Sequence, residues 1–516
     1  MKKRYIILIC LLGGLWGACG DFLTEESHEL LYARDCKDME ELLIGNGYMK
    51  ASLNTRPASY DVKAAISYYS WVHVMDDDVQ AAIAGQDVSK GTFTTKLGAF
   101  YRWEADPFNI QGDAFEDKTW ATLYEHIAVL NVILNKVEEF THDTEEDRNS
   151  VRGQCHFLRA AYYYLLVNLY AKPYDPVTAS GDLGVPLKLT PVVEDKDFTR
   201  TPVDSVYNQI VRDLELAVNY LDGITMPSVN RANQDAARLL LSRVYCYMGK
   251  WELVPELCRE ILKGNYTLMN MKNSNQAKWL YNGCPEIIFT QGQSVGAGVF
   301  YQENNANTVD GFVISPDLLE LFGEEEGDVR KDLLCRKHSY GKNFLFPAKL
   351  TGQDTATLNS MKTYISDCFL LRLPEAYLNL AEALAMTDQD LEARGVLADL
   401  MKTRIHDLRN LTESGEALVK LIRKERRREL CFECQRWFDL RRYAVSPKYP
   451  AATTVRHAMF EHNAGNANSD EVYVGYYELP AYPDGGWVMP IPKYEIEQTE
   501  GSIIQNERVN CILKEE

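Results

Sequence analysis

Hydrophobic residues recur every three or four positions along much of the chain, which is the spacing that places them on one face of a helix. The clearest run spans Trp120–Val137 and predicts one long helix. The same pattern predicts helices over Val151–Tyr170, Thr201–Leu221, Gln234–Met248, 252–262, Pro374–Met386 and Leu391–Ile405. We expect Thr201 to be an N-cap, because Pro202 suits the first turn. A long charged helix is expected over Glu416–Tyr443.

The predicted helices follow one another in pairs. Units of roughly 30–40 residues are typical of tetratricopeptide repeats, but irregular segments at 50–115, 264–315 and 444–490 interrupt them. We therefore expect a mainly α fold: an irregular tetratricopeptide-like helical-repeat scaffold with long loops and a few short strands, one of them over Glu286–Thr290. Long loops on a rigid scaffold usually carry function, so a ligand site is expected there.

The first residues have the composition of an export signal. Lys2, Lys3 and Arg4 precede an apolar stretch over Tyr5–Ala18, and Cys19 follows. This order predicts a lipoprotein signal peptide over residues 1–18 and a lipid anchor on Cys19. The apolar stretch of about 14 residues is shorter than the ~20 that a transmembrane helix needs. We expect residues 19–230 to hold the first helical hairpins and N-terminal ligand loops, and residues 231–516 to hold the remaining repeats and a mid-chain ligand loop.

The charge of the chain limits its partners. Its 516 residues carry a net charge of −19, and 46% of them are hydrophobic. An acidic surface repels the phosphates of nucleic acids, so we expect no nucleic-acid partner. A neutral ligand suits this charge better, and the 30 tyrosines and 8 tryptophans can supply flat faces for sugar rings.

The twelve cysteines do not form a regular framework. Cys10 falls in the expected signal peptide, Cys19 is the expected anchor, and the other ten are scattered. Cys431 and Cys434 form a C-x-x-C pair, but no second pair lies at a spacing that completes a zinc site. We interpret most of these cysteines as small buried residues, and we expect no metal and no cofactor.

No catalytic motif is convincing in the sequence. It lacks a G-x-S-x-G turn, an H-E-x-x-H motif and a Walker loop. The paired carboxylates of a glycosidase depend on a separation in space, so they stay open. Asp76, Asp77 and Asp78 can bind a metal or sugar hydroxyls, or they can form a solvated loop.

The charged helix has acids three positions before bases. The pairs are Glu425 with Arg428, Glu433 with Arg436, and Asp439 with Arg442. This spacing favours ion pairs on a helix surface. We interpret them as internal pairs that tie the last helix to loops, not as a catalytic or nucleic-acid element.

Several separated segments resemble one family. They are Cys19–Leu23, Arg152–Tyr164, Leu371–Ala383, Glu425–Arg442, Pro490–Pro492 and Gln505–Asn506. In this order they resemble the SusD/RagB family of outer-membrane nutrient-binding lipoproteins, and the most specific of them, Glu425–Arg442, is similar to E-R-R-x-E-L-A-F-E-G-x-R-W-x-D-L-R-R. Cys431 and Cys434 stand where this pattern has Ala and Gly, Pro374 where Ala is common, and Glu507 where Pro is common.

The resemblance implies a role in nutrient capture. Proteins of this family bind an oligosaccharide or polysaccharide and deliver it to a TonB-dependent, SusC-like transporter, and they are not enzymes. The chain is therefore expected to be a lipid-anchored protein on the surface of the outer membrane. A RagB-like protein that takes up peptides, a surface glycoside hydrolase and a helical-repeat adaptor without a small ligand remain as alternatives.

The resemblance also places the ligand between N-terminal loops and a mid-chain loop. By position, the candidates are Trp71, Asp76, Asp77, Trp103 and Asn109 in the first region, and Phe300, Tyr301 and Asn304 in the second. An aromatic platform with acid and amide partners suits a sugar. For any one of these aromatic residues, core packing explains its presence equally well.

Overall fold

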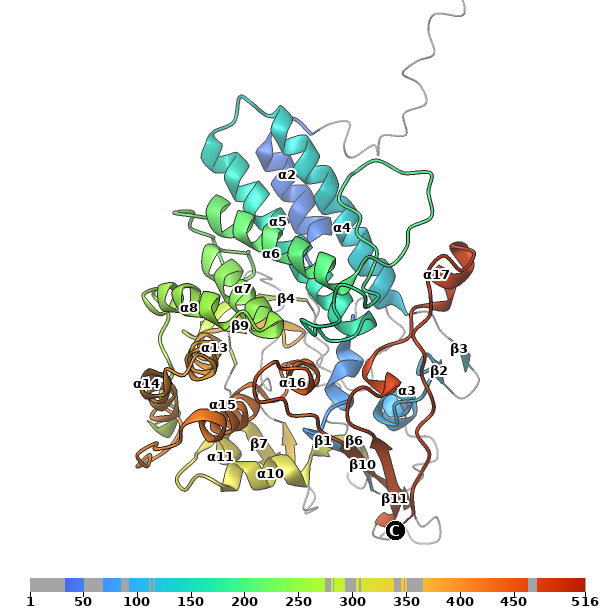
Figure 1. The fold of residues 1–516 in the computed structure, drawn as a ribbon, viewed down its shortest axis with the longest axis vertical. Helices are drawn as coiled ribbons and strands as arrows, with labels where there is room; N and C mark the ends of the chain where they lie inside the picture. Colours follow the sequence, from blue (N-terminus) through green and yellow to red (C-terminus); the bar gives the residue numbers. More distant parts are fainter. Residues whose placement is uncertain are drawn as a thin grey trace, which may run out of the picture.

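Figure 1 shows the fold in the computed structural model of this chain. The structure describes residues 33–50, 68–84, 92–110, 113–114, 117–273, 280–281, 283–292, 303–305, 308–337, 345–347, 349, 365–462 and 471–515. The expected signal peptide, the expected anchor Cys19 and the candidate ligand residues Phe300 and Tyr301 lie outside these ranges.

Long helices packed in series form the body of the molecule (Figure 1). The series runs through α4 (Lys118–Lys136), α5 (Glu145–Tyr170), α6 (Val203–Tyr220), α7 (Gln234–Met248), α8 (Val254–Leu262), α13 (Leu373–Met386), α14 (Asp390–Met401) and α15 (Gly415–Leu430). Each of these helices packs on the one before it, and α15 also packs on α13. The prediction of a mainly α fold with a tetratricopeptide-like scaffold is confirmed.

Shorter helical segments lie beside this body. Those that the structure describes are α2 (Cys36–Leu42), α3 (Thr92–Tyr101), α10 (Pro316–Gly323), α11 (Arg330–Leu334), α16 (Arg436–Ala444), α17 (Lys493–Gln498), η1 (Leu43–Gly47), η4 (Ser70–Val74), η6 (Val137–Glu139), η7 (Trp251–Leu253), η8 (Met271–Asn273) and η9 (Gly485–Trp487). Among the described helices, none has both the length and the apolar character needed to cross a membrane.

The strands form small antiparallel sheets. The pairings are β1 (Val79–Ala84) with β6 (Thr308–Ile314), β6 with β5 (Glu303–Asn305), β4 (Ile287–Gln291) with β9 (Phe369–Arg372), β2 (Asn109–Ile110) with β3 (Asp113–Ala114), β7 (Cys335–Lys337) with β8 (Leu345–Pro347), and β10 (Val455–His462) with β11 (Glu471–Leu479). The strand expected over Glu286–Thr290 is confirmed as β4, one residue later. The segment 444–490, expected to be irregular, also contains the strands β10 and β11, which pair with each other, and β10 packs on β1.

Two predicted helix starts need correction. α5 begins at Glu145 rather than Val151, because Thr144 caps it and accepts a hydrogen bond from the backbone N–H of Asp147 (3.1 Å). The first turn of α5 is charged, so hydrophobic spacing does not mark it. For α6 the N-cap position belongs to Pro202, which makes no capping hydrogen bond through its side chain, and not to Thr201.

The C-terminal end of α5 carries carbonyl oxygens that no further helical turn satisfies. Arg441 donates to two of them, and Arg200 (2.9 Å) and Asn506 (2.8 Å) both donate to the carbonyl of Tyr170. Burial lowers the pKa of Arg200 and of Arg441 to about 10, and neither forms an ion pair with an acid that the structure describes. The partial negative charge at the C-terminal end of α5 stabilises these two guanidiniums in place of an acidic side chain.

The charged helix expected over Glu416–Tyr443 is two helices. α15 ends at Leu430 and α16 begins at Arg436. Between them Phe432 (φ +63°) and Cys434 (φ +54°) adopt the left-handed conformation, which does not continue an α-helix. The chain therefore changes direction in the middle of the segment that most resembles the family.

This break decides which ion pairs form. Two of the three predicted pairs are present, Glu425 with Arg428 (3.0 Å) and Asp439 with Arg442 (2.7 Å). The third is absent from the described contacts, because Glu433 lies within the break and only Arg436 belongs to a helix. Glu433 pairs instead with Arg372 (2.8 Å), and Arg436 pairs with Asp77 (2.6 Å). The interpretation as internal pairs that tie these helices to other segments is confirmed.

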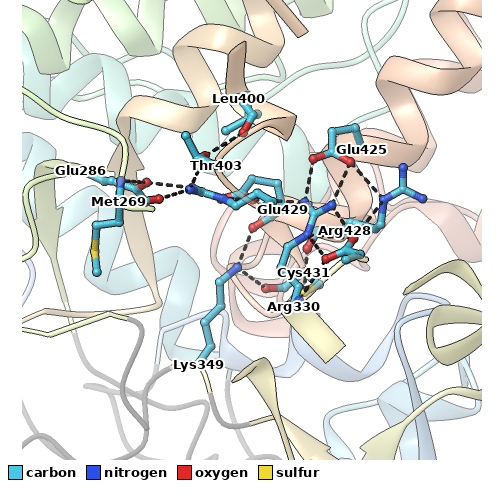
Figure 2. A network of polar contacts seen from close by, with 12 residues as sticks. Met269, Glu286, Arg330, Lys349, Leu400, Thr403, Glu425, Arg428, Glu429 and Cys431 are labelled. Atoms are coloured by element: carbon cyan, nitrogen blue, oxygen red, sulfur yellow. Dashed lines mark hydrogen bonds and ion pairs between the residues drawn. The ribbon is translucent and has the colours of Figure 1, made fainter. Parts of the chain in front are cut away.

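Glu429 of α15 lies at the centre of a buried charge network (Figure 2). Its carboxylate accepts hydrogen bonds from Arg372 (2.6 Å), Arg404 (3.0 Å) and Arg330 (3.2 Å). Burial acts to raise the pKa of Glu429, but Arg404 and Arg372 outweigh it and hold that pKa well below its ordinary value. The carboxylate is therefore ionised although it is buried.

Each of the three arginines also reaches a second acid. The contacts are Arg404 with Glu286 (2.7 Å), Arg330 with Glu425 (2.7 Å), and Arg372 with Glu433 (2.8 Å). Lys349 donates to the backbone carbonyls of Glu429 (2.7 Å) and Cys431 (3.0 Å), where α15 ends (Figure 2). The network thus joins α15 to β9, to α11 and to the segments beside β4 and α14.

Glu429→Gln keeps the size of this side chain and removes its charge, so three buried guanidiniums lose their shared partner. We expect the free energy of unfolding, measured by urea denaturation, to fall by roughly 3–5 kcal/mol. The control is Glu416→Gln, since Glu416 pairs with Lys420 (2.7 Å) on the surface. That change should leave the unfolding curve unchanged. Equal stability of the two variants would contradict the central position of Glu429.

Candidate functional site

Trp71 lies in a buried aromatic cluster. It belongs to η4 and is 1% exposed. Its ring stacks on Phe100 of α3 (centroids 5.2 Å apart, planes at 12°), and Phe108 meets it edge-on (6.1 Å, 88°). Both contacts are favourable aromatic geometries. The cluster holds η4 against α3.

Trp103 is buried beside this cluster, at the end of α3. Its indole N–H donates to the carbonyl of Met75 (2.9 Å), and its ring stacks on His457 of β10 (4.2 Å, 21°). Tyr101 stacks on His457 as well (4.0 Å, 10°). The ring nitrogens of His457 lie 2.6 and 2.7 Å from the backbone carbonyls of Tyr101 and Asp76. His457 therefore joins the hairpin, α3 and the turn before β1.

The three consecutive aspartates are not a solvated loop, because two of them, Asp77 and Asp78, form ion pairs and the third, Asp76, is buried beside them. Asp77 accepts two hydrogen bonds from Arg436 (2.6 and 2.8 Å), and Asp78 accepts one from Arg427 (2.8 Å). Asp76 and Asp78 are 4% and 2% exposed. The carboxylate oxygens of the three lie within 4.8 Å of one another, a spacing that can hold a metal ion. Two guanidiniums already supply the positive charge here, so the arrangement favours an anchor over a cation site.

The charges of this aspartate cluster do not balance. Three acids face two guanidiniums, and one oxygen of Asp78 is buried without a hydrogen-bond partner in the described part of the chain. Burial raises the pKa of Asp76 well above its ordinary value and also raises that of Asp78. Burial acts to raise the pKa of Asp77 too, but Arg427 and Arg436 outweigh it and hold that pKa low. The cluster therefore keeps a proton to a higher pH than a free aspartate does.

The structure brings four of the candidate ligand residues together, all facing inward. Trp71, Trp103, Asp76 and Asp77 lie around η4 and α3, and their neighbours already occupy their polar atoms and ring faces. Ligand contact by these four stays a prediction, and it requires the surrounding packing to open.

Of the other candidates, the structure describes the backbone of two. Asn109 lies in β2 and Asn304 in β5, and the structure does not describe their side chains. β5 and β1 belong to one sheet, on either side of β6. The N-terminal segment and the mid-chain segment therefore meet at that sheet, whereas Phe300 and Tyr301 lie outside the described residues.

A cavity of about 440 Å³ opens beside the aromatic cluster, between the segment 105–108 and the C-terminal segment 490–508. Phe108 and Tyr494 contribute aromatic surface to its lining, and Asp106, Lys493 and Glu497 contribute charge. Because Phe108 also packs on Trp71, the buried cluster supports one wall of this cavity.

Sequence reasoning misses Phe108, Tyr494 and Glu497. The available signal is the closing motif of the resemblance, because Pro490–Pro492 and Gln505–Asn506 both line the cavity. Hydrogen bonds of Gln505 to the backbone N–H (2.7 Å) and carbonyl (2.8 Å) of Ile491 hold the two halves of this motif together.

Cys434 lies 3.0 Å from His73, a pair that can resemble a thiol nucleophile with its base. Burial raises the pKa of Cys434 well above its ordinary value and lowers that of His73 to about 3. Asp367 approaches the same ring nitrogen of His73 (3.9 Å) that faces the sulfur, whereas a catalytic acid contacts the other one. Neither a reactive thiolate nor an oriented base results.

Comparison with known proteins gives matches along most of the chain. Residues 54–246 match the family model SusD-like, described as starch-binding associating with outer membrane, and residues 330–508 match the model of the SusD family. The SusD-like proteins P25 and P2 of Formosa agariphila are 26% identical over 175 residues and 23% identical over 379 residues. These matches cover 32% and 63% of this chain; they span only 31% of the length of P25, and 70% of that of P2.

Solved structures share the fold. A SusD superfamily protein from Bacteroides thetaiotaomicron is 23% identical, with a TM-score of 0.66 over 92% of this chain and 100% of its own. A protein described as a laminarin binding SusD-like protein is 20% identical, with a TM-score of 0.61 over 92% of this chain and 99% of its own.

The extra proton of the aspartate cluster makes stability depend on pH. A carboxyl group whose pKa is higher in the folded state stabilises the fold at low pH, and this contribution is lost as the pH rises through the folded pKa. Asp76→Asn mimics the protonated form and does not titrate. We therefore expect its unfolding free energy, measured from about pH 5 to about pH 8, to improve relative to the wild type as the pH rises, by at most about 1.4 kcal/mol per pH unit.

Asp77→Asn is the matched control for this experiment. Because the pKa of Asp77 is held low and its carboxylate pairs with Arg436, the change should destabilise the protein at every pH in that range. A constant difference between Asp76→Asn and the wild type would show that the cluster holds no extra proton.

Proposed function

Because this chain belongs to the SusD/RagB family, we propose that it is a glycan-binding protein of the outer membrane. The two family matches carry the proposal. Together, the residues that they cover contain the aromatic cluster, the aspartate cluster with its arginines, and both walls of the cavity described above. A relative of the same fold is described as binding laminarin, a neutral glucan, which supports a carbohydrate as the ligand class.

The proposal extends to delivery of the glycan to a TonB-dependent, SusC-like transporter. Its support is the family and the expected lipid anchor on Cys19, which would keep the protein beside its transporter between cycles of capture and release. In this proposal the protein acts as a lid on the barrel of the transporter, and release depends on motion of this lid and not on bond chemistry.

Two other functions remain as alternatives. A RagB-like member would take up peptides, and a surface glycoside hydrolase would cleave the glycan that it binds. The Cys434–His73 pair offers no support for nucleophilic catalysis, because burial holds the thiol in its neutral form.

Isothermal titration calorimetry against a panel of polysaccharides and peptides tests the binding function. We expect saturable binding to at least one neutral glycan, such as laminarin, starch or xylan, with no new reducing ends during incubation. Binding of peptides alone would replace the proposal with the RagB-like alternative. Release of sugar that stops on substitution of one Asp or Glu would establish a hydrolase.

The Cys19→Ala variant tests delivery. We expect it to leave the membrane fraction, and we expect a barrel protein to co-purify with the wild type from outer membranes. A variant that stays in the membrane, or a wild type that never co-purifies with a barrel, would contradict this part of the proposal.

A further inference from the structure

We propose that the cavity between residues 105–108 and 490–508 is a binding site for a neutral sugar of the glycan, an inference that rests on the function proposed above. The cavity, of about 440 Å³, falls within the range of small-ligand sites.

Apolar side chains supply surface for the C–H faces of a sugar ring. Phe108 and Tyr494 line the cavity from opposite walls, with Pro490 and Pro492 beside Tyr494. Phe108 is fixed by its edge-on contacts with Trp71 and Phe100, and Tyr494 by a hydrogen bond from its hydroxyl to the carbonyl of Asp117 (3.0 Å). Rigid aromatic side chains of this kind bind with little loss of side-chain entropy.

The charged groups of the lining select against an anion. Lys493 pairs with Asp106 (2.6 Å), and Arg508 donates to backbone carbonyls, including those of Glu104 and Gly486 (3.0 Å each), while its Nε is buried without a hydrogen-bond partner among the described residues. Glu497 makes no ion pair or side-chain hydrogen bond with any residue that the structure describes, so its carboxylate can accept from a ligand. An anion would face the carboxylates of Asp106 and Glu497, whereas sugar hydroxyls can donate to those carboxylates and accept from the donors of the lining.

A hydrogen bond from the backbone holds the two walls of the cavity together, whereas an exposed ion pair lies on its lining. The backbone N–H of Ala105 donates to Asn510 (2.7 Å), which ties the two walls together. The pair of Lys493 and Asp106 spans the mouth, and these side chains are 71% and 38% exposed. A surface pair of this kind contributes little, so an incoming hydroxyl can displace it.

A second cavity gives a matched comparison. It has about 420 Å³ and lies between α10 and the helices α15 and α16. Its own acids and bases pair across it, Glu324 with Lys424 (2.8 Å) and Asp317 with Arg427 (3.5 Å). Ala451 lines this cavity as Ala105 lines the first, and both alanines are half-buried.

The test compares Ala105→Trp with Ala451→Trp in the full mature chain. Each indole fills one of the two cavities, and calorimetry measures binding of laminarin, starch, xylan and the acidic polysaccharide polygalacturonate. We expect Ala105→Trp to weaken binding of the neutral glycan by about tenfold or more, and Ala451→Trp to leave it unchanged.

Glu497→Gln, with the surface change Glu146→Gln as its control, gives a second measurement that does not depend on tolerance of a bulky residue. It should weaken binding by about tenfold.

The outcomes separate this inference from the proposed function. Neutral-glycan binding that is unchanged in both Ala105→Trp and Glu497→Gln would overturn the location while leaving the function intact. A wild type that prefers polygalacturonate or a cationic peptide would overturn the neutral-sugar assignment. A wild type that binds no glycan would overturn the proposed function, and this inference with it.

Discussion

One carboxylate, that of Glu429, holds three guanidiniums from separate parts of the chain. Removing ions from water is so unfavourable that a buried cluster survives only when each member keeps its partners. Arg330, Arg372 and Arg404 each reach Glu429 and at least one further acid, so no member can move alone. The position of α15 against its neighbouring segments is therefore set by charge, over and above the apolar packing around it.

α15 and the helix that follows it, α16, also hold the N-terminal segment in place. Arg427 of α15 and Arg436 of α16 pair with Asp78 and Asp77. The turn that carries these aspartates supports His457 through the carbonyl of Asp76, and the stacked rings next to it support the wall of the cavity. The charge network and the candidate site are thus parts of one arrangement, in which the break between α15 and α16 lets the two helices point their arginines at one turn.

Local sequence patterns predict the bounds of several helices, but they fail where contacts with residues distant in the sequence determine the local structure. Hydrophobic spacing predicts α7 with the bounds that the structure has, Gln234–Met248. It misses the break after Leu430, because acids and bases continue at helical spacing through it. The Gly that the family pattern has at position 434 is the signal that could have revealed it, since left-handed residues are commonly glycine.

The candidate site shows the same limit. Whether a tryptophan is core or platform depends on what covers it, and Trp103 is covered by His457, more than three hundred residues away. The hairpin of β10 and β11 is likewise stabilised by pairing and by packing on β1, which no local window contains. By contrast, the closing motif Gln505–Asn506 is visible in the sequence, although its place at the end of α5 and beside the cavity is not.

The residues that cap the C-terminal end of α5 affect the order in which the chain folds. The carbonyl of Tyr170 accepts from Asn506, 336 positions later, as well as from Arg200, and two other carbonyls of the same helix end accept from Arg441. Contacts of such sequence separation form late, because a long loop must close first. The end of α5, the longest described helix, is therefore completed only when residues near the end of the chain pack against it.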